Sequence, residues 1–262
     1  MIYDLHNDFP TFFKETEYRR YVCSLPTGVT PIAAIWTSGM GDSAFEKVEH
    51  ITEKLQTRRV PIAIEDVGFL SEINRYETFD YSRYSYCSLT WNFNNDFAGG
   101  ALDDGGLTEL GKRVISLMAC GNCVLDVAHL NKKSFYAAIE HADRVLCSHT
   151  GFNGHLRSLD DRQIRALIEK CAIVGLCAVT AFTDAHTADG LESVIDGFVQ
   201  KYGVDNLAIG SDFCGSSDFP PDVTDYVGLA KVADGLLRRG YDDVSVNKIF
   251  YGNAYRFFNT EK

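Results

Sequence analysis

The chain has 262 residues, of which 45% are hydrophobic and 23% charged, as in an ordinary globular protein. Asp and Glu number 36 against 25 Lys and Arg, so the formal net charge is −11, which argues against nucleic acid or an anionic membrane surface as a partner. No stretch approaches the ~20 apolar residues of a membrane helix, and no signal-peptide pattern opens the chain, so we expect a cytoplasmic protein.

Apolar runs alternate with amphipathic stretches along the whole chain, which is the pattern of repeated β-α units. We predict strands at 2–8, 30–37, 60–66, 85–91, 122–129, 144–150, 172–179 and 207–213. We predict helices at 44–58, 107–119, 131–142, 161–170, 191–202, 222–239 and 244–258, with the weakest pattern over 67–84. Asp160 and Gln163 predict a capping box at the fourth of these helices. Eight apolar strands separated by helices predict an α/β fold, a single-domain (β/α)8 TIM barrel over 1–262.

Polar side chains gather where the predicted strands end. In the opening segment DLHND, strand alternation would send His6 and Asp8 to the same face. The carboxyl ends of barrel strands carry the chemistry of such folds. The residues at these ends are His6, Asp8, Glu65, His129, His149 and Asp212.

Imidazole and carboxylate ligands together suit Zn²⁺ and similar ions, Mn²⁺ and Co²⁺ included. A carboxylate such as Glu65 can bridge two ions that lie ~3.5–4 Å apart. The sequence therefore predicts a two-metal site at the carboxyl end of the barrel.

The chain resembles the membrane (renal) dipeptidase family, peptidase family M19. The matching segments are DLHNDFP, AIED, SLTWNFNN, GGLTELGKRVI, VLDVAHL, LCSHTGFNGHLRSLDDRQI, IGSDFCG and YGNAYRFF. The resemblance implies a (β/α)8 barrel of the metal-dependent hydrolase type with two Zn²⁺ per chain. It further implies a zinc-dependent metallo-dipeptidase that cleaves dipeptides, L-D dipeptides among them, by attack of a metal-bridging hydroxide. The implied partner is a small dipeptide, with a homodimer left open.

Carried over onto matching positions, the resemblance gives each metal ligand a role. His6 and Asp8 would bind one zinc ion. His129 of VLDVAH and His149 of CSHT would bind the other, and Glu65 of AIED would bridge both.

Further positions concern the substrate. Arg157 of HLRSLDD matches the arginine that grips the substrate carboxylate, and a guanidinium fork suits that group. A surface arginine paired with Asp160 or Asp161 is the alternative. Trp91 stands where the family commonly has a histidine, so the carbonyl oxygen would depend on zinc or on a donor such as His155 at the substrate.

Asp212 of GSDF matches the family's catalytic carboxylate, which would move a proton from water to the leaving amine. Asp126 lies three residues before His129 and is expected on the opposite face, as a supporting or packing group. Cys214 replaces the aspartate of the usual DFDG. Such departures leave two alternatives: another binuclear-metal amidohydrolase acting on N-acyl amino acids or lactones, or a non-catalytic family member.

Overall fold

A computed structural model describes residues 1–259, in which eight parallel strands form a closed barrel. Each strand pairs with its neighbours in the sequence, and β8 pairs with β1. The strands are β1 (Ile2–Asn7), β2 (Val29–Trp36), β3 (Ile62–Glu65), β4 (Tyr86–Ser88), β5 (Val124–Asp126), β6 (Val145–Thr150), β7 (Val174–Leu176) and β8 (Leu207–Ile209). The predicted (β/α)8 barrel is confirmed.

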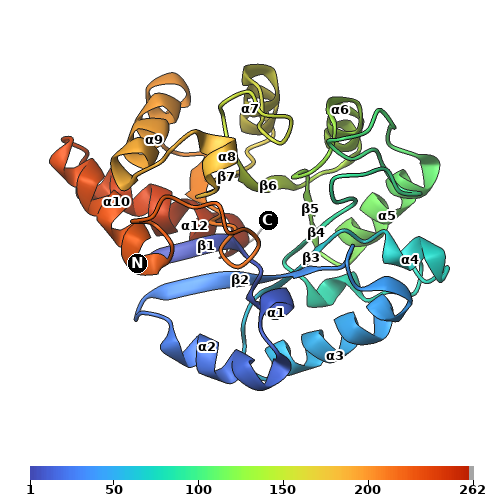
Figure 1. The fold of residues 1–262 in the computed structure, drawn as a ribbon. Helices are drawn as coiled ribbons and strands as arrows, with labels where there is room; N and C mark the ends of the chain where they lie inside the picture. Colours follow the sequence, from blue (N-terminus) through green and yellow to red (C-terminus); the bar gives the residue numbers. More distant parts are fainter. Residues whose placement is uncertain (260–262) are drawn as a thin grey trace.

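Helices surround the strands, and Figure 1 shows the longer ones from α2 to α10 following one another around the barrel in chain order, whereas α12 lies near the middle of the view beside β1. The longer ones are α2 (Tyr18–Ser24), α3 (Ala44–Gln56), α5 (Glu109–Cys120), α6 (Lys132–His141), α7 (Asp161–Glu169), α9 (Ala188–Tyr202), α10 (Tyr226–Arg238) and α12 (Asn253–Asn259). Shorter helices are α1 (Phe9–Phe12), α4 (Phe69–Glu72), α8 (Thr180–Thr183) and α11 (Asp243–Asn247). None of the helices within residues 1–259 is long and apolar enough to cross a bilayer.

Strand alternation divides the core into two parts. Tyr3 and Leu5 of β1 point into the barrel, whereas Ile2 packs outward under the helices. Each of the strands β2 to β8 adds one inward-facing residue to the inner core, with the residue for β7 lying directly before that strand. These residues are Ile32, Ala63, Tyr86, Val124, Leu146, Ile173 and Ala208. Tyr251, Phe257 and Phe258 from the C-terminal segment pack against this inner core. Aromatic side chains therefore plug the amino end of the barrel.

The predicted capping box at α7 is present, with Asp160 accepting from the Gln163 N–H and Gln163 accepting from the Asp160 N–H. Three details differ from the sequence prediction. The helix predicted over 244–258 consists of α11, a π-helical turn (Lys248–Gly252) and α12. Segment 67–84 contains only α4 and a 3-10 turn (Tyr81–Arg83). Several strands end before the polar residues that follow them.

Candidate metal centre

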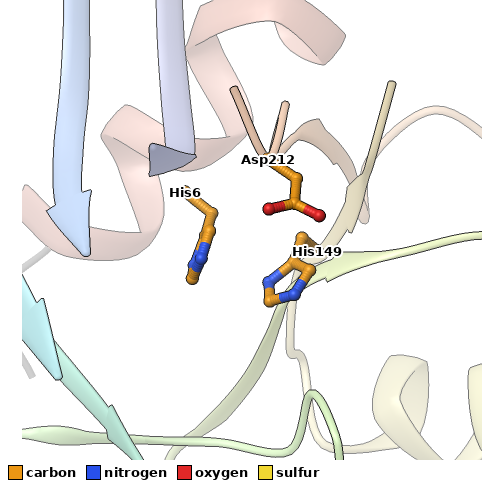
Figure 2. A group of neighbouring side chains, drawn as sticks. All are labelled: His6, His149 and Asp212. Atoms are coloured by element: carbon orange, nitrogen blue, oxygen red, sulfur yellow. The ribbon is translucent and has the colours of Figure 1, made fainter. Parts of the chain in front are cut away.

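The six polar residues predicted at the strand ends lie together at the carboxyl end of the barrel. Figure 2 shows His6, His149 and Asp212 pointing into a common space from β1, β6 and the loop after β8. Two further groups of ligand atoms each fall within 4.8 Å of one another, and Glu65 belongs to both. They are His6, Asp8 and Glu65, and Glu65, His129 and His149.

The DLHND segment brings His6 and Asp8 together in a way that strand alternation alone does not explain. Strand β1 ends at Asn7, and Asp8 occupies the position before α1 with φ −86° and ψ 17°. That turn directs the Asp8 carboxylate back toward the strand, and its Oδ2 lies 3.2 Å from His6 Nε2. Asp8 therefore reaches the site from the loop.

Glu65 lies between the two groups of ligand atoms. Its Oε2 is 3.6 Å from His6 Nε2, whereas its Oε1 is 2.6 Å from His129 Nε2 and 3.9 Å from His149 Nε2. Each carboxylate oxygen thus faces a different part of the cluster. A carboxylate in this arrangement can contact two cations at once.

Hydrogen bonds on the far side of two imidazoles leave their Nε2 atoms directed at the site. Tyr86 donates its hydroxyl hydrogen to the Leu5 carbonyl (2.7 Å), so the Tyr86 oxygen accepts from Nδ1 of His6 (2.8 Å). Nδ1 of His129 donates to Asn92 Oδ1 (2.9 Å). With Nδ1 protonated, the Nε2 of each ring carries a lone pair, which is the form that binds metal.

His149 is held in the same way through a buried carboxylate. Ser148 donates its hydroxyl to Asp126 Oδ2 (2.6 Å), so its oxygen accepts from Nδ1 of His149 (2.8 Å). Asp126 Oδ1 also accepts the N–H groups of Ser148 and Ala128. Asp126 therefore supports the backbone and the imidazole of a site residue, which agrees with the supporting role considered from its sequence position.

Asp4 makes an equivalent arrangement between β1 and β8, and sequence reasoning missed it. Its Oδ1 accepts from the N–H groups of Ser211 and His6, and its Oδ2 accepts from the hydroxyls of Ser211 and Tyr226. Ser211 directly precedes Asp212. A charged residue within the apolar run IYDL, two positions before His6, was the available signal.

Several atoms of the cluster are buried without a hydrogen-bond partner. Within the described residues these include His6 Nε2 and both carboxylate oxygens of Asp8. Burial raises the pKa of Asp8 and, together with the negative charge of Asp8, raises that of Asp212 well above its usual range. Burial also opposes ionisation of Glu65, but His129 and His6 outweigh it and hold that pKa well below the usual range. Unpartnered lone pairs and crowded carboxylates fit divalent cations, which would compensate the cost of burying them.

The backbone at the strand ends adopts conformations that few residues favour. His129, Asp212 and Asp66 have positive φ angles of 67°, 63° and 76°. Such left-handed conformations cost free energy for residues other than glycine and cluster at functional sites. They follow the strand ends: Asp66 comes directly after β3, and His129 and Asp212 come three residues after the last residues of β5 and β8. Both His129 and Asp212 contribute to the cluster at the barrel mouth.

A cavity of about 390 Å³ opens onto this cluster, and Arg157 lines it together with Phe182. The Arg157 side chain is buried, and its guanidinium lies 5.6 Å from the centre of the Phe182 ring. One guanidinium nitrogen donates to Nε2 of His129 (2.8 Å) and of His149 (3.0 Å). A metal ion bound at these Nε2 atoms would replace both hydrogen bonds and free this nitrogen. Arg157 is therefore a buried cation at the edge of the cavity.

The alternative of a surface arginine paired with acidic neighbours is wrong. Asp160 instead pairs with Lys132 at 2.8 Å, and Asp161 pairs with Lys201 at 2.9 Å and with Arg165 at 3.2 Å.

The two other substrate candidates occupy different places. Trp91 lines the cavity, with its ring centre 6.2 Å from that of His129. His155 is exposed and lines a neighbouring cavity of about 700 Å³ instead. Its Nδ1 accepts from the backbone N–H of Arg157 (3.1 Å), and its ring centre lies 5.0 Å from that of Phe182, which lines the cavity at the cluster.

The structure is thus a (β/α)8 barrel with a cluster of metal-ligand side chains at its carboxyl end. The model of the membrane dipeptidase family (Peptidase family M19) matches residues 50–262. The chain belongs to this family and is a hydrolase of the dipeptidase class.

Three similar proteins illustrate the relationship. An uncharacterized protein in the pqqA 5′ region of Klebsiella pneumoniae is 31% identical over 186 residues, covering 63% of this chain and 68% of that protein. The crystal structure of the dipeptidase AC, a metallopeptidase of family M19, matches with a TM-score of 0.80 and 18% identity over 98% of this chain and 97% of that one. A metallopeptidase of Rhodobacter sphaeroides, liganded with a phosphinate mimic of L-Ala-D-Ala, matches with a TM-score of 0.79 and 17% identity over 98% of both chains.

Proposed function

We propose that this protein is a binuclear zinc dipeptidase. His6 and Asp8 would hold one ion, His129 and His149 the other, and Glu65 would bridge them. The observation that carries this proposal is the position of Glu65, whose two oxygens face different histidines. Three imidazoles and two carboxylates form a borderline donor set that suits Zn²⁺, with Mn²⁺ and Co²⁺ as substitutes.

Asp212 would move protons in the proposed reaction. Bound zinc would lower the pKa of a water molecule and polarise the scissile carbonyl. Asp212 would accept the proton that this water loses and deliver it to the leaving amine. Its buried carboxylate lies near His6 and His149. The two groups of ligand atoms that contain Glu65 do not include Asp212.

Arg157 would bind the free carboxylate of the substrate. A guanidinium donates two parallel hydrogen bonds to a carboxylate, and a buried one does so with little competition from water. Because the fork stands at the edge of the cavity, a chain that continued past the second residue would have no free carboxylate at this point. The enzyme would therefore select dipeptides over longer peptides. The L-Ala-D-Ala mimic in the Rhodobacter sphaeroides metallopeptidase supports including L-D dipeptides among the substrates.

The test is hydrolysis by purified, zinc-loaded protein of L-L and L-D dipeptides, tripeptides, C-terminal dipeptide amides, N-acyl amino acids and lactones. We expect dipeptides with a free carboxylate to be cleaved, tripeptides and amides to be poor substrates, and a chelator to abolish cleavage. Cleavage of N-acyl amino acids or lactones without cleavage of any dipeptide would contradict the proposal. Bound metal without turnover of any substrate would favour a non-catalytic family member.

A further inference from the structure

We propose that the cavity contains an aromatic subsite, made by Trp36, Trp91 and Phe12, that binds an aromatic or large aliphatic side chain on the amino side of the dipeptide. This inference rests on the proposed function, because the binding of the substrate carboxylate by Arg157 sets the direction of the peptide. All four residues line the same cavity of about 390 Å³.

The order of strands in the barrel fixes where the amino end must lie. Arg157 follows β6, and Trp36 is the last residue of β2. In a closed barrel ordered β1 to β8, β2 and β6 are four strands apart in either direction, so they stand opposite each other. A dipeptide held by its carboxylate at Arg157 and cleaved over Glu65 therefore extends toward Trp36, which pairs in register with Glu65.

The wall on that side is built from aromatic rings in contact. The ring centres of Trp36 and Trp91 lie 5.2 Å apart at 65°, an edge-to-face arrangement, and Phe93 extends the row 6.3 Å beyond Trp91. Phe12 is 66% exposed and lines the same cavity, so its ring is accessible to a ligand. Packed indoles and an exposed phenyl ring offer a large apolar surface to a ligand.

The position of Trp36 is fixed by the surrounding chain. Its backbone N–H donates to Thr11 Oγ1 (3.1 Å), which ties the end of β2 to α1. A side chain at Gly39 would collide with the Trp36 indole, so the loop after β2 is shaped around that ring. Within residues 1–259, Trp36 Nε1 is a buried donor without a hydrogen-bond partner.

In the part of the chain that the structure describes, no lining carboxylate is left over to recognise a charged side chain on the amino side of the substrate. Among the described residues, the carboxylates that line it are Asp8, Glu65 and Asp212, all of which the proposed function uses for metal or for proton transfer. Recognition of the amino-side residue is therefore left to apolar contact. Burying a phenyl or isobutyl group there would favour such substrates over glycine by about ten- to a hundredfold in kcat/KM.

The first test compares kcat/KM of the zinc-loaded enzyme for Gly-Ala, Leu-Ala and Phe-Ala, and for Ala-Phe as the positional control. We expect the ratio of Phe-Ala to Gly-Ala to be about ten or more and to fall below about three in Trp91→Ala and in Trp36→Ala. Tyr255→Ala on α12 removes an exposed aromatic ring at the other end of the barrel and should keep the ratio. A ratio near one in the unmodified enzyme would overturn the subsite.

A second test needs no turnover, since the chain has only two tryptophans and both line the cavity. In zinc-loaded Asp212→Asn, chosen to slow hydrolysis, Phe-Ala should change the tryptophan emission and bind at least about tenfold more tightly than Gly-Ala. Equal affinities, or no emission change with either peptide, would overturn the subsite. Tight Phe-Ala binding with no hydrolysis of any dipeptide by the unmodified enzyme would instead contradict the proposed function and leave the subsite supported.

Discussion

At the scale of single residues, the side chains at the site are held from behind by hydrogen bonds. The Nδ1 atom of each site histidine is hydrogen-bonded: that of His6 to Tyr86, that of His129 to Asn92 and that of His149 to Ser148. All three Nε2 atoms therefore face the same space. The ring orientations are therefore set before any ion binds, and such support typically contributes ten- to a hundredfold to metal affinity.

Asp212 tests the assignment of proton transfer. Asp212→Asn removes the basic carboxylate with little change in shape, so kcat should fall by about 10²- to 10⁴-fold. Zinc content should stay the same, because the five proposed ligands are unchanged in this variant. The measurement is kcat beside elemental analysis of the same preparation. Loss of zinc in step with activity would show that Asp212 acts as a ligand instead.

Arg157 tests carboxylate recognition. Arg157→Ala should lower kcat/KM for dipeptides by about 10- to 150-fold, the loss expected for a charge-assisted hydrogen bond. The same substitution should hardly affect dipeptide amides, which lack the charge. Arg157→Lys keeps the charge and should recover only part of the loss, because it lacks the planar fork. Equal losses for peptides and amides would contradict recognition of the substrate carboxylate by Arg157.

Sequence reasoning predicted the cluster residues because each is a metal-binding type at the end of an apolar run. It missed Asp4 because a carboxylate inside the barrel depends on hydrogen bonds from Ser211 and Tyr226, which are distant in the chain. Likewise, the contact between Trp36 and Trp91 joins the end of β2 to the loop after β4, which are distant in the chain, so local sequence does not reveal it.

At the scale of elements, two buried aspartates connect neighbouring strands beneath the site. Asp4 connects β1 to β8 through Ser211, and Asp126 connects β5 to β6 through Ser148. In both pairs the serine immediately precedes a site residue. The strands were predictable from apolar runs, whereas their early ends were not, because the apolar run of β5 continues past its last paired residue, Asp126, to the left-handed His129.

Asp126 tests this support. Asp126→Asn keeps the size of the side chain but weakens the hydrogen bonds from Ser148, so zinc affinity should fall by about 10- to 100-fold. Competition with a chelator of known affinity measures the change. Asp143→Asn replaces an exposed aspartate and is the matched control. An unchanged zinc affinity in Asp126→Asn would show that the aspartate only packs the barrel.

At the scale of the whole molecule, aromatic side chains close one end of the barrel while the other end concentrates charge. Six polar residues with unpartnered or crowded atoms destabilise the metal-free fold, and bound ions would offset that cost. Net charge and composition placed the chain among ordinary globular proteins, but the residue-specific prediction came from where polar residues fall relative to the strands.

Removing metal should therefore lower the melting temperature. With free zinc at about 1,000 times Kd, binding stabilises the fold by about 4 kcal/mol, or roughly 10 °C in Tm for a domain of this size. Calorimetry with and without chelator measures the shift. The shift should be much smaller in Glu65→Gln, whereas Glu109→Gln, an exposed change on α5, should keep it. A Tm that changes with neither zinc nor chelator would contradict metal binding by the folded protein at this site.

The most direct test of the central claim is the zinc content of the purified protein, measured together with dipeptide hydrolysis as zinc is restored after chelation. A binuclear centre bridged by Glu65 predicts about two zinc ions per chain, activity that returns as they bind, and loss of both in Glu65→Gln. Full dipeptidase activity in protein that holds less than one metal ion per chain would contradict it.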